Sequence, residues 1–329
     1  MSSILVTGGA GYIGSHVVRQ LGEQREQIYV LDNLSTGFRS AVLHGELIEG
    51  DTNDASLVSG LLKSRKIDSV LHFAAHIVVP ESVIDPLKYY RNNTGGTRTL
   101  LQCCAEAGVK QFIFSSTAAV YGIPSGGIAS EETPTAPINP YGNSKLMSEW
   151  MLRDVAAAHP LRYIALRYFN VAGADPGGRI GQSTPQATHL IKVACEHVVG
   201  RRDHVSIFGT DYDTPDGTCV RDYIHVEDLA SAHLRALAHL RAGGASTTLN
   251  CGYGRGASVR QVLDEVARIS GKKLRITESP RRPGDPPILV AKADRIREEL
   301  SWVPRHRDLA GIVSSALAWE QRLLRQPMT

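Results

Sequence analysis

Short runs of apolar residues alternate with longer segments of helical periodicity along the first half of the chain. Candidate strands are residues 4–7, 28–31, 47–49, 69–74, 111–115 and 163–168. Several of these runs are apolar at consecutive positions, so that both faces of each strand would be buried. Strands of this kind separated by helices are typical of parallel βαβ units. The pattern therefore predicts an α/β fold built on a doubly wound parallel sheet with helices on both faces.

The second half of the chain has a different texture. Clusters of Pro and Gly interrupt it at residues 173–178, 211–217 and 281–287. We expect a first domain over residues 1–172 and, over residues 173–329, mainly a smaller C-terminal α/β substrate lobe. Residues 220–226 and 248–251 are candidate strands that return to the main sheet.

The first candidate strand runs directly into a glycine-rich turn that is followed by a helical segment. Gly8, Gly11 and Gly14 have the spacing that lets a backbone turn tightly, approach a pyrophosphate and pack a helix on a strand. The N-terminus of the following helix adds N–H groups and the positive end of a dipole. The first domain is therefore expected to be a Rossmann domain that binds a dinucleotide.

Acidic residues after the second and third strands indicate which dinucleotide is bound. Asp32 ends the second strand, about twenty residues after the loop, where a carboxylate accepts hydrogen bonds from the adenosine ribose hydroxyls. A carboxylate there repels a 2′-phosphate, so we expect NAD rather than NADP; Arg39 is the nearby cation that argues the other way. Asp51 ends the third strand and is either a partner of the adenine amino group or an ordinary loop carboxylate.

Tyr141 and Lys145 lie four residues apart in a segment that begins with Asn139 and Pro140. Asn is a good N-cap and Pro a good first helical residue, so a helix is expected to begin here and to carry both side chains on one face. A fixed ammonium beside a phenol favours the phenolate and lowers its pKa. The pair is therefore a candidate general acid/base, and its alternative is the polar edge of an amphipathic helix.

Composition excludes several classes of protein. Hydrophobic residues make up 42% of the chain and charged residues 21%, and the net charge is only +3. We expect no nucleic-acid partner, because the sequence contains no basic block. The five cysteines form no CxxC motif and are expected to be buried free thiols, with no metal site. The first residues carry no charged leader and no apolar run spans a membrane, so we expect a cytoplasmic protein with no membrane partner.

Three longer segments extend the pattern formed by the glycine loop and the Tyr141/Lys145 pair. Residues 112–122, 166–170 and 220–226, in this order, resemble the extended short-chain dehydrogenase/reductase family and, within it, the UDP-glucose (UDP-galactose) 4-epimerases. The resemblance runs from about residue 3 to residue 319. It implies NAD-dependent C4 epimerisation of UDP-hexoses through a transient 4-keto intermediate, and a homodimer that pairs two long helices of each subunit.

The resemblance also implies roles for individual residues. Thr117 would hydrogen-bond the sugar O4, Tyr141 would be the base and later the acid, and Lys145 would bind the nicotinamide ribose and keep Tyr141 acidic. The implied NAD contacts are Gly8, Gly11, Tyr12, Ile13, Gly14, Asp32, Asn33, Asp51, Thr52, Phe73, Ala74, Ala75, Asn93, Tyr141, Lys145 and Phe169. This chain has Ile77 where family members often have Lys, which removes one expected cofactor contact.

A second set of residues is implied for the UDP-sugar. Its members are Thr117, Asn170, His189, Leu190, Ser206, Phe208, Arg221, Arg282, Asp285 and Leu289. Guanidinium groups suit a pyrophosphate dianion, and Arg221 and Arg282 match the arginines of the family. His189 replaces a family Asn. Leu289 matches the position that controls room at the sugar 2-substituent, so we expect some tolerance of UDP-GlcNAc and UDP-GalNAc.

Two other readings stay open from the sequence. Nucleotide-sugar 4,6-dehydratases of the same family need an Asp-Glu pair after the catalytic Thr, and this chain has Ala118 and Ala119 there. UDP-glucuronate epimerases or decarboxylases require only one more guanidinium near C6. A non-catalytic NAD sensor is an alternative of a different class, but it has no need of Thr117, Tyr141 and Lys145 together.

Overall fold

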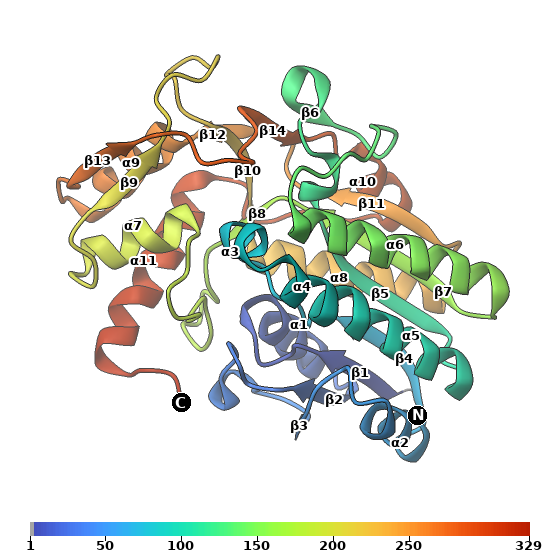
Figure 1. The fold of residues 1–329 in the computed structure, drawn as a ribbon. Helices are drawn as coiled ribbons and strands as arrows, with labels where there is room; N and C mark the ends of the chain where they lie inside the picture. The colour runs from blue at the N-terminus through green and yellow to red at the C-terminus, as the bar shows by residue number, and fades with distance from the viewer. Residues whose placement is uncertain (1–2) are drawn as a thin grey trace.

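The main sheet is parallel throughout and has seven strands (Figure 1). The structure is a computed structural model that describes residues 3–329, so Met1 and Ser2, which belong to the segment expected to carry no charged leader, lie outside the described residues. In spatial order the strands are β11 (Thr247–Cys251), β7 (Arg162–Tyr168), β5 (Gln111–Thr117), β4 (Ile67–His72), β1 (Ser3–Thr7), β2 (Gln27–Asp32) and β3 (Glu46–Glu49). The prediction of a doubly wound parallel sheet is confirmed.

Helices cover both faces of this sheet because its strands are apolar on both. Ile4 and Val6 of β1 pack into one core with the helices of one face, while Leu5 between them belongs to the core on the other face. The helices of the first face are α1 (Tyr12–Glu23) and α8 (Val226–Arg241). Those of the second face are α2 (Ala55–Ser64), α5 (Gly96–Ala107) and α6 (Pro140–Ala158). The period-2 alternation of side chains thus explains the unbroken apolar runs.

The second half of the chain contributes most strands of two smaller sheets. The larger joins β12 (Gly256–Ser258), β10 (Val220–His225), β14 (Ile288–Ala291) and β6 (Ile128–Ala129), with β8 (Asn170–Ala172) paired to β10. Of these strands, β6 and β8 come from residues 1–172. The smaller pairs β13 (Ile276–Ser279) with β9 (Val205–Phe208). Of the two strands considered for return to the main sheet, 247–251 does return. The expectation is wrong for β10, because its edges pair with β8, β12 and β14.

The remaining helices complete the second lobe and one rim of the first. α7 (Leu190–Val198), α9 (Val259–Ser270) and α11 (Leu309–Arg325) pack on one another beside β9 and β13 (Figure 1). The others are α3 (Val79–Ile84), α4 (Pro86–Tyr89), the π-helix Tyr90–Gly95, α10 (Asp294–Leu300) and the 3-10 turns Arg39–Ala41, Ala118–Tyr121 and Ser125–Gly127. Among residues 3–329, no helix combines the length and apolar character that crossing a bilayer requires.

Buried cysteines and local helix signals agree with the sequence analysis. All five cysteines are buried and free. Asn139 caps α6, since its side chain accepts a hydrogen bond from the Gly142 N–H at 2.9 Å, and Pro140 is the first helical residue. Tyr141 and Lys145 consequently lie in the first two turns of α6 at the carboxyl end of β5.

Candidate active site

The glycine loop between β1 and α1 packs so closely on backbone atoms that Gly8 and Gly14 have no room for a side chain. Gly8 has a φ of +71°, in the left-handed region that favours glycine. A Cβ on Gly14 would lie 2.2 Å from the Gly8 carbonyl oxygen and 2.8 Å from the Gly9 Cα. Gly11 is the N-cap of α1 and no side chain caps the helix, so its first N–H groups remain available to an anion.

Asp32 stands at the end of β2, next to this loop. Its carboxylate accepts hydrogen bonds from the Ala10 and Leu34 N–H groups, both at 2.9 Å. Burial raises the pKa of Asp32, and these two hydrogen bonds oppose the rise. The side chain is thereby fixed in a largely dehydrated position where a ribose diol is a fitting partner.

The roles of Asp51 and Arg39 near the adenosine are left open by the sequence, and the structure shows the partners of both side chains. Asp51 lies two residues past the end of β3 and accepts hydrogen bonds from the Asn53 N–H at 2.8 Å and the Asn33 side-chain amide at 3.0 Å. Arg39 forms an exposed ion pair with Glu49 at 2.7 Å. A guanidinium held by Glu49 is poorly available to a 2′-phosphate, which agrees with the preference for NAD.

Tyr141 and Thr117 meet where α6 passes the end of β5. The Thr117 oxygen accepts the Ala119 N–H at 3.1 Å, so its own proton is free to donate, and its side chain hydrogen-bonds the Tyr141 phenol. Burial raises the pKa of Tyr141 to about 12, and the Thr117 contact lowers it by less. The two hydroxyls form a short relay whose end faces the cavity.

Lys145 is buried beneath this relay. Its ammonium donates a hydrogen bond to the Ser115 carbonyl at 2.9 Å and lies 5.0 Å from the centre of the Phe114 ring. Burial lowers the pKa of Lys145 to about 7, against the opposing effect of the Glu149 charge. Dehydration of the phenol therefore dominates the pKa of Tyr141 while the Lys145 ammonium is bonded to Ser115, and the lowering of that pKa by Lys145 stays a prediction.

Asn93 also lies behind the cavity wall. Its side chain accepts the His76 N–H at 2.8 Å and donates to the His76 carbonyl and the Ser144 hydroxyl, both at 3.0 Å. Asn93 and Lys145 are the two implied cofactor residues that do not line the cavity. The structure shows Asn93 joining the segment after β4 to α6.

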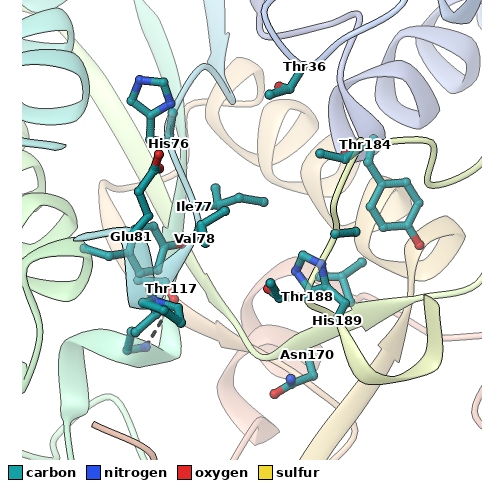
Figure 2. Close-up of a pocket in the computed structure, with 18 of the residues that line it drawn as sticks. Thr36, His76, Ile77, Val78, Glu81, Thr117, Asn170, Thr184, Thr188 and His189 are labelled. Atoms are coloured by element: carbon teal, nitrogen blue, oxygen red, sulfur yellow. Dashed lines mark hydrogen bonds between the residues drawn. The ribbon is translucent and has the colours of Figure 1, made fainter. Parts of the chain in front are cut away.

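One cavity of about 1600 Å³ brings together the two sets of residues expected from the sequence. It begins at the glycine loop, passes Thr117 and Tyr141, and continues into the second lobe. Figure 2 shows Ile77, Val78 and Glu81 on one side of it and Thr184, Thr188 and His189 on the other. The expected residues on its wall are Gly8, Gly11, Tyr12, Ile13, Gly14, Asp32, Asn33, Asp51, Thr52, Phe73, Ala74, Ala75, Thr117, Tyr141, Phe169, Asn170, His189, Leu190, Ser206, Phe208, Arg221, Arg282, Asp285 and Leu289.

Two arginines from different elements converge in the second lobe. Arg282 donates to the Asp285 carboxylate at 2.8 Å and lies over the Phe208 ring at 4.6 Å. Arg221 on β10 lies 3.9 Å from the same carboxylate. Leu289 is directly beside Arg221 in the register of β10 and β14. Asp285 therefore holds two cations at one place, where a dianion can bind both.

His189 and Gln182 form a polar contact on the opposite wall. The His189 Nδ1 lies 2.8 Å from the Gln182 side-chain nitrogen, and burial lowers the pKa of His189. The ring is therefore neutral near pH 7 and serves as a hydrogen-bonding group rather than a cation. Ser206, further along the wall, lies 3.1 Å from the Thr277 hydroxyl.

Several residues on the cavity wall were not predicted from the sequence. They include Ser35, Thr36, Glu81, Lys88, Thr184, Thr188, Arg201 and Arg202. Ser35 and Thr36 follow Asp32 closely, which is a signal that could have been used. The rest come from loops and short helices with no periodic or motif signal, and only the chain path brings them to the cavity.

The geometry at the glycine loop fits NAD. The uncapped helix N–H groups suit a pyrophosphate, and Asp32 suits a ribose diol. Because Gly14 has no Cβ, the loop can pack closely against its own backbone. These features lie at the carboxyl edge of the parallel strands, where open α/β sheets bind ligands.

The chain is similar to known proteins over nearly its whole length. The model of the "NAD dependent epimerase/dehydratase family" matches residues 4–252. A curated relative, UDP-glucose 4-epimerase of Azospirillum brasilense, is 60% identical over 97% of this chain and 92% of its own length.

Solved structures agree with this match. UDP-glucose 4-epimerase from Brucella ovis in complex with NAD is 45% identical, with a TM-score of 0.94 over 97% of this chain and 98% of that one. The UDP-Glc/GlcNAc 4-epimerase of Campylobacter jejuni is 49% identical, with a TM-score of 0.86 over 98% of this chain and 100% of that one.

Proposed function

The chain belongs to the NAD dependent epimerase/dehydratase family, and from this premise we propose that it is a UDP-glucose 4-epimerase, an isomerase that uses NAD. It interconverts UDP-glucose and UDP-galactose. The observation that carries the proposal is the single cavity that joins the glycine loop, the Thr117/Tyr141 relay and the arginine pair. A sensor of NAD would need only the first of these.

The chemistry is a reversible oxidation at C4 of the sugar. When bound, NAD supplies the hydride acceptor and returns the hydride. Tyr141, with Thr117 bridging, takes the proton of the C4 hydroxyl as C4 loses hydride, which leaves a 4-ketose. The ketose turns over, C4 regains hydride on its other face, and Tyr141 returns the proton, so that no external oxidant is consumed.

Binding by the UDP portion allows the sugar to turn. Arg221 and Arg282 are proposed to hold the pyrophosphate, with Asp285 placing them and Asn170 donating to a phosphate. Leu190 and Phe208 are proposed to enclose the uracil, with Ser206 at its edge and His189 nearby. Binding energy placed on the carrier leaves few fixed contacts to the hexose.

The division of labour between the two halves is part of the proposal. Residues 1–172, joined by β11, are proposed to bind NAD, and residues 173–329 are proposed to bind mainly the UDP-sugar. The proposed NAD contacts are those implied by the family resemblance, with Lys145 reaching the nicotinamide ribose. The free buried cysteines support a reducing compartment such as the cytoplasm.

The proposal is tested by incubating the purified protein with UDP-galactose, without added cofactor. Anion-exchange chromatography or NMR then resolves the products. UDP-glucose is the expected product, and its formation would also show that NAD arrives bound. Absence of product even after adding NAD, together with turnover of UDP-glucuronate, would replace the proposal by a UDP-glucuronate epimerase.

N-acetylated sugars are proposed as further substrates, because Leu289 occupies the wall with a side chain smaller than Tyr. Leu289→Tyr should reduce turnover of UDP-GlcNAc and UDP-GalNAc at least about tenfold and leave UDP-galactose within a few-fold of the wild type. Leu289→Met, which conserves volume, should retain all three activities. A Leu289→Tyr protein as active on UDP-GlcNAc as the wild type would contradict this role.

A homodimer through α5 and α6 is also proposed. The two helices lie side by side (Figure 1), and Met147 and Trp150 are exposed three residues apart on α6. Trp150→Glu should convert the dimer to a monomer in analytical ultracentrifugation. Val303→Glu, at another exposed apolar residue, should leave the dimer intact. A wild-type protein that sediments as a monomer would overturn the proposal.

A further inference from the structure

A buried ion pair lies directly behind the catalytic residues. The Glu149 carboxylate on α6 accepts three hydrogen bonds from the Arg167 guanidinium on β7, at 2.6, 3.0 and 3.2 Å. The side chains are 6% and 9% exposed. The Ser116 hydroxyl donates a further short hydrogen bond to the same carboxylate. Neither charged group lines the cavity, so the proposed mechanism does not use them.

Glu149 is one helical turn beyond Lys145 and on the same side of α6. The direct partners of the Lys145 ammonium are a carbonyl and an aromatic ring, and neither carries a negative charge. Burial favours the neutral amine, and the charge of Glu149 opposes this. The carboxylate therefore acts on Lys145 through space rather than through a shared hydrogen bond.

The other groups around Lys145 do not replace this charge. They are Tyr141 on the same helix, Ser115 and Phe114 on β5, and His72 on β4. On β7, Tyr168 hydrogen-bonds the Ser115 hydroxyl and Arg167 pairs with Glu149. Burial, followed by the charge of Lys145, lowers the pKa of His72 to about 3, so that His72 is neutral. Burial raises the pKa of Tyr168, which keeps the Tyr168 phenol neutral as well.

We propose that Glu149 is a positioning residue that keeps the side chain of Lys145 charged, and that Arg167 sets how strongly it does so. Its bearing on catalysis rests on the proposed function, in which a charged Lys145 is expected to stabilise the Tyr141 phenolate and to bind a ribose diol. The Ser116 contact adds a second effect, because Ser116 immediately precedes Thr117 and ties the end of β5 to the same carboxylate. One ion pair thus acts both on Lys145, one helical turn from Tyr141, and on the end of β5 that carries Thr117.

Glu149→Gln tests this inference, since it removes the charge and keeps the shape. The titration of Lys145 is followed by NMR of isotope-labelled lysine side chains in cofactor-free protein, with the signal identified from a Lys145→Met sample. The pKa of Lys145 is expected to be lower in Glu149→Gln than in the wild-type protein measured in the same way. The alkaline limb of kcat against pH should move to lower pH with it, with about a tenfold loss of kcat near neutrality.

Arg167→Gln breaks the same ion pair from its other end and should act in the opposite direction. It leaves the Glu149 charge without its counter-ion, so the Lys145 titration and the alkaline limb should move to higher pH. A role confined to bracing α6 against β7 predicts the same sign for both variants. If Arg167→Gln does not fold, the titration of Glu149→Gln decides alone.

Glu320→Gln is the matched control. It breaks the buried Lys192–Glu320 ion pair between α7 and α11, away from Lys145. Stability should fall, while the Lys145 titration should not move. A Glu149→Gln protein that loses stability with an unchanged Lys145 titration would overturn the inference. A wild-type protein that epimerises no UDP-sugar would overturn the proposed function and leave the measured coupling standing.

Discussion

Replacing Tyr141 by Phe should lower kcat for UDP-galactose by at least about a thousandfold while the protein keeps its NAD. The substitution removes one oxygen and leaves a ring of the same size in a buried site. The Thr117 hydroxyl is then the remaining member of the relay, and a hydroxyl without an ionisable partner is a poor base near neutral pH. Turnover is measured by product chromatography, and bound NAD by absorbance after denaturation.

Tyr163→Phe is the matched control for this experiment. Tyr163 lies on β7, is partly exposed and does not line the cavity, so loss of its hydroxyl should leave kcat within about twofold. Near-normal turnover in Tyr141→Phe would remove Tyr141 from the mechanism. Loss of NAD from that variant would instead assign Tyr141 to cofactor binding.

Gly14→Ala should weaken NAD binding by at least about a hundredfold. The added Cβ would lie 2.2 Å from the Gly8 carbonyl oxygen and 2.8 Å from the Gly9 Cα. Both atoms belong to the backbone, so the loop must move and its N–H groups lose their alignment. Calorimetric titration of cofactor-free protein measures the affinity, and the rise in Tm on adding NAD should be lost as well.

Gly60→Ala provides the contrast within the same domain. Gly60 lies inside α2, and a Cβ there would meet nothing within 4 Å. Alanine should stabilise the helix by about 0.5–1 kcal/mol and leave NAD affinity unchanged. Wild-type affinity in Gly14→Ala would show that the cofactor does not bind at this loop.

Local spacing explains how much of the site was visible in the sequence. The glycine loop with Asp32, and Tyr141 with Lys145, are each set by a single turn or helix whose geometry follows from a few neighbouring residues. The Asn139 cap, the six strands proposed for the main sheet and the burial of the cysteines were predicted for the same reason. Apolar periodicity fixes which faces are covered before any long-range contact is known.

Contacts between distant segments were not visible in this way. β10 was a plausible strand for the main sheet, but strand pairing depends on which edges the rest of the chain leaves free, and it pairs in the second sheet. No sequence pattern predicts that Glu149 contacts Arg167. Likewise, no pattern predicts that Thr184 and Lys88 line the same cavity. The rise in the pKa of Tyr141 that burial causes was not predicted, because burial is a property of the packed site.

The sequence by itself determined the α/β class, the dinucleotide loop and the residue types of the proton relay, since these depend on short-range backbone and side-chain geometry. The tertiary structure decided that one cavity unites the loop, the relay and the arginines, and that the Lys145 ammonium bonds to the Ser115 carbonyl with Glu149 one turn beyond it on α6. The physical reason is that dehydration and through-space charge depend on what packs around a group, and the packed neighbours come from segments far apart in the chain.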